Sequence, residues 1–502
     1  MSQQQRRGQR IYLLGKSASG KEIMAYLNNT VGQLPASLLP CVNCHQYNGE
    51  GLHEGGIKPS DIRWSNLTKA YGPSKASAES HPPYNQRSIK KAISMGVGSG
   101  GQSLSNSMPR YQLNHQDMSD LVAYLAELGT YRASGISETS ISIGVILPGN
   151  NKIKSHAIKE VISAYFSNLN QQGGIYQRHI KLLFITSPPN NSKEELDAFE
   201  KKLRHGNVFA FVASNLQGIE ALMNDYTDRT GVPVIGALSA MPHLAFPLNR
   251  YIFYLLSGKS RQTLALQSFV EKTHQLKSTA TSIALLENTA GFSALTQIFS
   301  KRNQNTPRAG VITIDPSTSK QSLKSKLIQQ KNNKVNSVYL LISKPMQAIF
   351  FNVAEEINWF PIVLIPGSEI NPELFSIPLG FDQRTFIALP SLPTDYSSSG
   401  LIHYNNLQKE HQATSNYKHS QLLAISAAKL LKEALIKTGY KMEQQKLVAM
   451  MESLYQFDTK LTRPVSYGPN RRVGISGAYI VTIDLTRKTV VPVSKWLETP
   501  GL

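Results

Sequence analysis

The sequence predicts a multidomain protein: an all-α domain in residues 1–132, a linker in residues 133–140 and a two-lobed α/β body in residues 141–502. At 502 residues, the chain is too long for a single hydrophobic core. Its two cysteines lie in one short stretch near the amino-terminal end, within a region of short helices and loops. From residue 141 onward, apolar strand-like runs alternate with helical stretches, which is typical of α/β proteins.

The composition is that of a basic, globular protein. Hydrophobic residues make up 41% of the chain, charged residues make up 17%, and the formal net charge is +20 at pH 7. Residues 1–132 hold 14 basic and 8 acidic side chains, which leaves 39 and 25 for the remainder. This spread of positive charge favours an acidic partner. Basic stripes interleaved with aromatic residues are absent from the sequence, so we expect no nucleic acid partner.

Both cysteines belong to the stretch Cys41–His45, which reads CVNCH. This C-x-x-C-H spacing is the pattern of covalent haem attachment. Two thiols three positions apart can add to the two vinyl groups along one edge of a porphyrin, and the adjacent imidazole can then reach the iron. We therefore expect one haem c, attached through Cys41 and Cys44, with His45 as an iron ligand.

Helical signals surround this motif in the first domain. Helices are expected around Arg10–Leu14, over Asn85–Met95, and after Asn114 as an N-cap. The last helix has one apolar face, formed by Met118, Leu121, Val122, Leu125 and Leu128. A glycine run, Gly96–Gly101, leads to the dipeptide Met108-Pro109 ahead of that helix.

This order of motifs resembles a small class I cytochrome c. The resemblance covers residues 1–132 and implies terminal helices that cross over the haem. It also implies that His45 is the proximal ligand and Met108 the distal one. A thioether ligand suits low-spin iron and raises the reduction potential, which is the arrangement of an electron carrier.

Other interpretations of these residues remain open. The alternative sixth ligands are Met24, Met95 and His53. A zinc half-site is disfavoured because no second cysteine pair exists; the histidines that could complete it are His53, His81 and His115. A thioredoxin-like dithiol needs a strand–helix context that Pro40 and the glycine-rich flank do not supply.

In the second part of the chain, predicted strands alternate with predicted helices, which is typical of parallel sheets covered by helices. Strands are predicted at Ile141–Pro148, His179–Ile185, Val208–Ala213, Val232–Ile235, Ser282–Leu286, Ala309–Ile314, Ser337–Ile342, Pro361–Ile365 and Thr385–Leu389. Helices are predicted at Val161–Leu169, Glu194–Leu203 and Leu216–Thr230.

This part resembles a type I periplasmic solute-binding protein of the branched-chain amino acid and amide family of ABC importers. The matching segments are Ile143–Pro148, Asn170–Tyr176, Gly231–Gly236 and Phe457–Val481, the last with Tyr467-Gly-Pro-Asn470. The resemblance implies lobe one at about 141–258 and 391–460, and lobe two at about 259–390 and 461–490. A cytochrome followed by such a body resembles a recurrent bacterial fusion.

In this family a small ligand sits in the cleft between the lobes, at the carboxyl ends of the strands. Members that bind amino acids usually carry a hydroxyl residue where Ala240 stands and a tyrosine where Ala290 stands. Alanine can hold neither the carboxylate nor the ammonium group of a ligand. Ser214 and Ser239 are the remaining candidate hydroxyl donors.

Two functions follow from these resemblances. The first is an exported cytochrome that carries single electrons to or from a docked redox partner. The alternative is a solute receptor that delivers a small ligand to a membrane permease, with the haem as a redox sensor or accessory. We expect no enzyme, apart from weak peroxidase activity if Met108 were displaced. Covalent haem attachment implies a periplasmic or extracellular site, with a signal peptide that is removed or missing, because the first residues lack an apolar signal.

Overall fold

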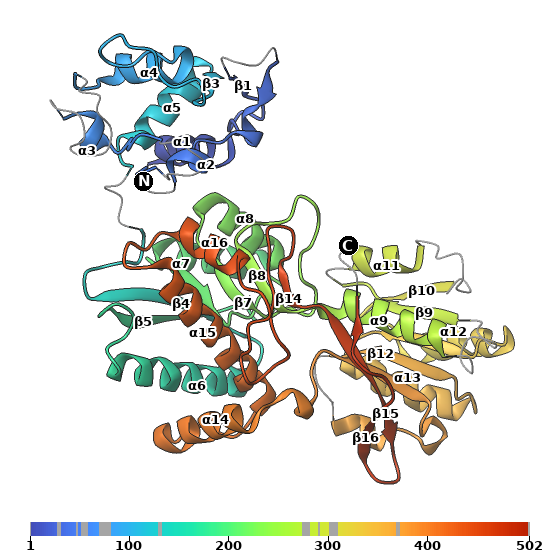
Figure 1. The fold of residues 1–502 in the computed structure, drawn as a ribbon. Helices are drawn as coiled ribbons and strands as arrows, with labels where there is room; N and C mark the ends of the chain where they lie inside the picture. Colours follow the sequence, from blue (N-terminus) through green and yellow to red (C-terminus); the bar gives the residue numbers. More distant parts are fainter. Residues whose placement is uncertain are drawn as a thin grey trace. The chain divides into compact units, whose positions relative to one another are not determined.

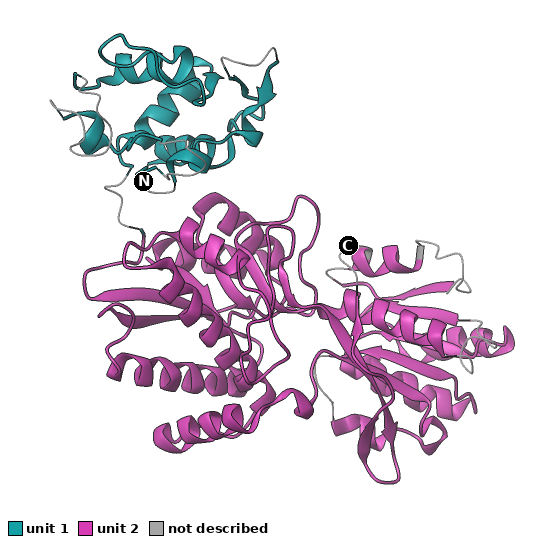
Figure 2. Cartoon of the chain, in the orientation of Figure 1, with its two compact units in different colours: residues 1–133 teal, residues 134–502 magenta. Residues whose placement is uncertain are grey.

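The protein consists of two compact units, residues 1–133 and residues 134–502 (Figure 2). The computed structural model describes residues 2–27, 32–46, 49–51, 59–69, 82–128, 133–273, 282–289, 292–300, 310–367 and 372–499. In that part of the chain, no helix is both long enough and apolar enough to cross a membrane.

The first unit is built mainly from helices (Figure 1). They are α1 (Gln3–Leu14), α2 (Val42–His45), α3 (Trp64–Leu67), α4 (Gln86–Met95) and α5 (His115–Leu125). A small antiparallel sheet of order β2-β1-β3 consists of β1 (Met24–Tyr26), β2 (Leu34–Pro35) and β3 (Arg110–Gln112). The predicted helices are confirmed. The sheet was not predicted, because strands this short carry no recognisable alternation.

An asparagine side chain caps the start of α4 and of α5, and of these two only Asn114 was predicted as an N-cap. Asn85 Oδ1 accepts a hydrogen bond of 2.9 Å from the Ser88 N–H, and Asn114 Oδ1 accepts one of 2.9 Å from the Asp117 N–H. Both asparagines satisfy a backbone donor that the first turn of a helix leaves free. Helix α4 ends at Gly96, whose φ of 67° favours glycine.

Helices α1 and α5 cross at Gly8. A β-carbon on Gly8 would lie 1.9 Å from the carbonyl oxygen of Asp120 and 2.9 Å from Cβ of Tyr124, so only glycine allows this approach. One turn further along α1, the ring of Tyr12 packs on Tyr124 with 5.3 Å between centroids. The predicted contact between the first and last helices of this unit is therefore present.

The same crossing carries an ion pair. Arg7 binds Asp120 in a bidentate manner, with 2.6 Å from Nε to Oδ2 and 2.9 Å from Nη2 to Oδ1. Burial raises the pKa of Asp120, but hydrogen bonds from Arg7 and Gln116 outweigh it, and the pKa of this carboxyl lies below its usual value.

The first lobe of the second unit is a parallel six-stranded sheet of order β14-β8-β7-β6-β4-β5. Its strands are β4 (Ser140–Leu147), β5 (His179–Thr186), β6 (Ala210–Val212), β7 (Val234–Ala237), β8 (Ile252–Leu256) and β14 (Val473–Ile475). Its helices are α6 (Lys152–Gln171), α7 (Lys193–His205), α8 (Glu220–Thr230), α14 (Ser398–His411), α15 (Lys418–Thr438) and α16 (Gln444–Glu452). Helix α15 packs against α6 and β7 (Figure 1).

The second lobe is a mixed sheet of order β10-β9-β11-β12-β13-β15-β16, with β17 also paired to β15. Its strands are β9 (Ser282–Glu287), β10 (Gly310–Ile314), β11 (Ser337–Leu341), β12 (Ile362–Pro366), β13 (Thr385–Leu389), β15 (Gly477–Asp484), β16 (Thr489–Pro492) and β17 (Leu497–Glu498). Its helices are α9 (Gly258–Lys272), α11 (Phe292–Ser300), α12 (Lys320–Asn332) and α13 (Lys344–Glu356). Successive residues of β9 alternate between two core clusters, so both faces of the sheet are covered.

The domain boundaries differ from the prediction in two places. Strand β14 pairs with β8, so residues 473–475 lie in lobe one, whereas the sequence placed 461–490 in lobe two. The short strand joins a partner more than two hundred residues away, and no local pattern indicates that pairing. The predicted linker 133–140 also overlaps the second unit, because Ser140 already begins β4.

The Arg7–Asp120 pair predicts how the stability of the first unit depends on pH. Because the folded pKa of Asp120 is depressed, its stabilisation is present above the unfolded value of about 3.9 and is lost as the pH falls through the lower folded pKa. Thermal unfolding of the full chain, followed through haem absorption, should show D120N melting below wild type at pH 7. This gap should close as the pH is lowered below about 3.9.

Glu22, an exposed carboxylate of the same unit, provides the control. E22Q should melt with the wild type at both pH values. A D120N deficit of the same size at pH 7 and at pH 3 would contradict the assignment.

Candidate functional site

The haem-attachment motif lies at the start of α2. Cys41 immediately precedes this helix, and Cys44 and His45 belong to it. Both cysteines are free thiols and half-buried. Burial raises the pKa of the Cys41 thiol to about 11. The two thiols are therefore placed on one short turn, as the spacing predicted.

Two tyrosines hold this segment at its two ends. The Tyr111 hydroxyl donates to the Leu39 carbonyl at 2.5 Å, two residues before Cys41. The Tyr12 hydroxyl donates to the Gln46 carbonyl at 2.6 Å, directly after the motif. Because one tyrosine comes from β3 and the other from α1, the motif is fixed to two separate elements of the unit.

The orientation of His45 suits iron coordination. Its Nδ1 lies 3.0 Å from the backbone carbonyl of Ser60. A carbonyl oxygen can only accept, so Nδ1 carries the proton and donates, which leaves a lone pair on Nε2. Burial lowers the pKa of His45, which favours the neutral imidazole that binds a metal. Histidines that bind metals are commonly fixed by a second bond of this kind.

Met108 lies in a loop whose backbone carbonyls accept hydrogen bonds from a buried arginine. The Met108 side chain is half-buried, and Arg110, two residues later, is 1% exposed. Arg110 donates from Nη1 to the Met108 carbonyl and from Nη2 to the carbonyls of Leu104 and Ser105, at 3.1 and 3.3 Å. A β-carbon on Gly96 would lie 1.8 Å from the Arg110 Nε, so glycine is needed there.

Arg110 is a functional candidate that sequence reasoning missed. In the sequence, Arg110 is marked only as a charged residue directly after Met108-Pro109. In the structure it begins β3 and is buried, which is uncommon for a guanidinium group. Its hydrogen bonds are donated to three backbone carbonyls, and no pattern of side chains in the sequence predicts such bonds.

The remaining surroundings fit a flat, apolar group. Several half-buried side chains pack at the edge of the first unit's core: Leu14, Val42, Ile62, Trp64, Leu104 and Leu113. In the described residues, no group of three or more His, Cys, Asp or Glu side chains could hold a metal ion. His53 and His81 lie outside the described residues, and His115 is exposed. The two thiols, the oriented imidazole and this apolar margin fit a haem c.

Ser214 has a structural position in the second unit. Its hydroxyl accepts from the Ile146 N–H at 3.1 Å and donates to the Val212 carbonyl at 3.2 Å. It is fully buried. Because its only hydroxyl hydrogen is used within the sheet, Ser214 ties β4 to the end of β6 and presents no donor to a ligand.

Ser239 is likewise bonded inside the protein. Its hydroxyl donates to Glu220 Oε1 at 2.5 Å, and the other carboxylate oxygen accepts from the Gly218 N–H at 2.9 Å. Burial raises the pKa of Glu220, although the Ser239 bond opposes this. The structure thus brings Ser239 to a buried acid at the start of α8. Ala240 follows Ser239, and Ala290 lies outside the described residues.

Lobe two holds a lysine and a carboxylate that the sequence analysis did not select. Glu287 ends β9, is buried, and accepts a hydrogen bond from the N–H of Ser343, the residue that precedes α13. Lys259, at the start of α9, donates its backbone N–H to the Ala240 carbonyl at 2.8 Å. Burial lowers the pKa of the Lys259 amine, and the charge of Glu287 opposes that shift. An acidic residue at the end of a predicted strand was the signal for Glu287.

Comparisons with known proteins agree with this division of the chain. A periplasmic binding protein family model matches residues 140–489, and a cytochrome c family model matches residues 36–129. No curated protein was found to match the chain.

Solved structures share the fold of the second unit. A branched chain amino acid ABC transporter protein from Thermus thermophilus with bound valine has a TM-score of 0.57 at 13% identity, with 72% of this chain and 97% of that chain covered. A fatty acid ABC transporter substrate-binding protein from Thermomonospora curvata has a TM-score of 0.56 at 15% identity, with 74% and 95% covered. At these identities, the likeness establishes the fold alone.

The family model spans more than half of the chain, and the second model covers the residues around Cys41–His45. The chain therefore belongs to the periplasmic binding protein family and carries a cytochrome c domain ahead of its binding-protein body.

Proposed function

We propose that this protein is an exported carrier of single electrons, in which Cys41, Cys44, His45 and Met108 hold one haem c and the binding-protein body docks a redox partner. The bound haem supplies reversible one-electron chemistry at its iron. The protein attaches, orients and shields that group. On this proposal the chain is a carrier rather than an enzyme.

The observation that supports this function most directly is the bond from His45 Nδ1 to the Ser60 carbonyl at 3.0 Å. It sets the tautomer and the ring orientation, so the lone pair of Nε2 is available to bind an iron. Among the described residues, Nε2 of His45 has no hydrogen-bond partner, which is the state that an iron ligand requires.

Met108 is the methionine best placed to be the second axial ligand. It is half-buried in a loop held by Arg110, close in sequence to the buried Pro109. Met95 is 64% exposed at the end of α4, and Met24 belongs to the short strand β1. A methionine held in an ordered loop can maintain a weak iron bond, because little ordering entropy remains to oppose it.

The charge of the body supports a docking role. Beyond residue 132, the chain carries 39 basic and 25 acidic residues. A positive surface of this kind accelerates encounter with an acidic redox partner, and salt weakens the effect.

The ligand assignment predicts different effects for two methionine variants. M108A in the full chain should lose the methionine-to-iron absorption of the oxidised protein, and its reduction potential should fall by on the order of 0.1 V, within the ~0.8 V range that axial ligands span. M95A should match the wild type in both. Absorption spectra and potentiometric titration measure these effects.

Cys41→Ala combined with Cys44→Ala should leave no haem on the denatured chain, whereas wild type and M108A should retain it. If M108A kept the wild-type spectrum and potential, Met108 would be excluded as the ligand. If haem remained on the denatured double variant, the attachment site would be wrong.

Arg110 should act as a positioning residue for Met108. Arg110→Lys keeps the charge but loses the fork that reaches three carbonyls at once. A buried carbonyl left without its donor costs about 1–3 kcal/mol, and this cost destabilises the loop conformation that holds Met108 on the iron. For each ~1.4 kcal/mol lost, the state with the methionine off the iron should become about tenfold more populated. The readout is the pH at which the methionine-to-iron absorption disappears, which should be lower in this variant.

Arg87, an exposed arginine on α4, provides the matched control, and R87K should behave as wild type. An unchanged pH midpoint in R110K, with the fold intact by circular dichroism, would show that Arg110 does not position the ligand loop.

A second candidate function is a solute receptor, and two charged groups support it, the half-buried Lys259 and the buried Glu287. These groups stand at the start of α9 and at the carboxyl end of β9, where α/β folds bind ligands. The solved relatives include a protein with bound valine. Since both predicted serines are bonded internally, recognition here would rest on charged groups rather than hydroxyls.

Calorimetric titration of the full chain with leucine and with succinate tests the receptor function. K259M should weaken binding of either probe by about tenfold, the equivalent of ~1.4 kcal/mol, and K272M, at the exposed end of the same helix, should not. If neither probe binds the wild type, the electron-carrier proposal stands without a receptor role.

A further inference from the structure

The carbonyl that orients His45 belongs to a short segment that an arginine holds. Ser60, whose carbonyl oxygen lies 3.0 Å from His45 Nδ1, directly precedes Asp61. Arg63 Nε lies 3.0 Å from each carboxylate oxygen of Asp61, and Nη2 also donates to Oδ2. The backbone N–H of Arg63 donates to Asp61 Oδ1 at 3.0 Å. These bonds close a tight turn directly after the carbonyl that orients the imidazole.

The same guanidinium reaches the chain that follows the haem-attachment motif. Arg63 Nη1 donates to Glu50 Oε1 at 2.7 Å. A backbone bond supports this contact, because the Ile62 N–H donates to the Gly49 carbonyl at 2.8 Å. Arg63 therefore bridges two carboxylates, one next to the carbonyl that orients the imidazole and one shortly after the attachment motif.

The three side chains are partly shielded from water. The exposed fractions are 15% for Asp61, 29% for Arg63 and 36% for Glu50. Isolated surface ion pairs contribute little, but an arginine that binds a carboxylate with two donors and joins a second one forms a more rigid network. The charge of Asp61 also acts on the His45 ring: burial lowers the pKa of His45, and this carboxylate opposes the shift.

We propose that Asp61, Arg63 and Glu50 form a positioning clamp, which fixes the Ser60 carbonyl against His45 Nδ1 and thereby lowers the reduction potential of the haem. A carbonyl that is held in place accepts a stronger bond from Nδ1–H, which makes the imidazole a more basic iron ligand. A more basic ligand favours the oxidised iron. The effect on the potential rests on the proposed function, whereas the effect on the His45–Ser60 bond does not.

R63K tests the clamp at constant charge. Lysine keeps the positive charge but lacks the planar fork, so it cannot hold both carboxylates in the same geometry. Arg63 is partly exposed, so we expect the variant to fold. At a fixed applied potential, R63K should lower the ratio of oxidised to reduced haem by up to about tenfold, which is about 59 mV for a one-electron couple. Potentiometric titration of the full chain measures this rise in potential.

Exchange of the Nδ1 proton with solvent reports on the bond itself. In NMR spectra of the histidine-labelled full chain, the His45 Nδ1 proton should exchange faster in R63K than in wild type, because a loosened carbonyl protects it less. This measurement does not require bound haem. If wild type carried no covalent haem, the proposed function and the effect on the potential would both be wrong, and the exchange rates would still decide whether the clamp holds the bond.

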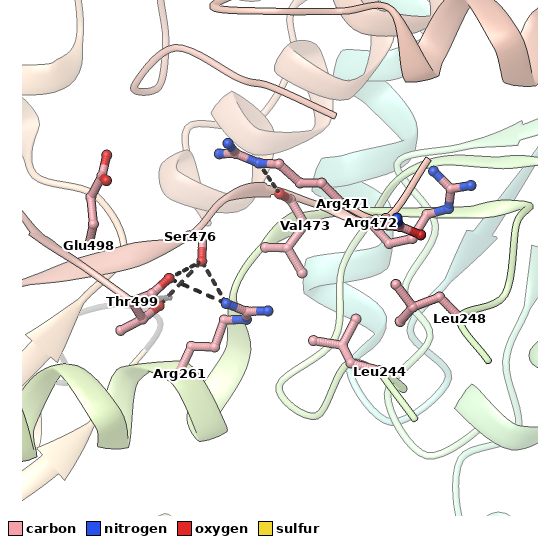
Figure 3. Close-up of a pocket in the computed structure, with 10 residues that line it drawn as sticks. Leu244, Leu248, Arg261, Arg471, Arg472, Val473, Ser476, Glu498 and Thr499 are labelled. Atoms are coloured by element: carbon pink, nitrogen blue, oxygen red, sulfur yellow. Dashed lines mark hydrogen bonds between the residues drawn. The ribbon is translucent and has the colours of Figure 1, made fainter. Parts of the chain in front are cut away.

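Arg261 provides the matched control, because it is a guanidinium bonded within the second unit. Its Nη1 donates to Ser476 Oγ at 3.0 Å and to the Thr499 carbonyl at 3.4 Å (Figure 3). R261K should lower the melting temperature, because these bonds are weakened, and should leave the reduction potential and the exchange of the His45 proton unchanged.

A purely structural role for the clamp has a different signature. If R63K melted below wild type but kept the wild-type potential and exchange rate, Arg63 would serve only stability and the proposal would be overturned. A potential that falls in R63K would equally contradict it, since the charge is unchanged and a looser carbonyl can only raise the potential.

Discussion

The close crossing of α1 and α5 at Gly8 is the constraint on which the first unit depends. Without a side chain at Gly8, the helices approach until its α-carbon faces the backbone of Asp120. That approach places Tyr12 against Tyr124, and from there the Tyr12 hydroxyl reaches the Gln46 carbonyl at 2.6 Å. The helix crossing therefore positions the haem-attachment segment, because it places Tyr12 where its hydroxyl can bond to Gln46. The Arg7–Asp120 pair at the same place makes this arrangement sensitive to acid.

In the second unit, the polar side chains near the strand ends form hydrogen bonds within the protein. The candidate hydroxyl donors Ser214 and Ser239 form hydrogen bonds within the protein, Ser214 with the backbone of β4 and β6 and Ser239 with the buried Glu220. Two charged side chains lie close in sequence to strand ends: Glu287 ends β9, and Lys259 lies at the start of α9, which follows β8. The family fold is thus retained, but the fold does not fix the chemistry of a ligand site, because function resides in particular side chains.

The parts of the haem site that could be predicted are those whose chemistry is local in sequence. Cys41–His45 is one turn, so its spacing alone indicates the attachment. The dipeptide Met108-Pro109 precedes a helix whose N-cap, Asn114, can be recognised from the sequence. Arg110 and Tyr111 could not be assigned in the same way. Tyr111 bonds a carbonyl 72 residues away, and Arg110 satisfies carbonyls of a loop whose path depends on Gly96.

The sequence by itself determined the two classes of fold, the motif for the cofactor and most of the helices and strands, because periodicity and capping act over a few residues. The tertiary structure alone decided which strands pair, and this is why Val473–Ile475 joins lobe one. It also decided which hydroxyls are already bonded. Those properties depend on groups far apart in the chain that only packing brings together, so no local pattern carries them.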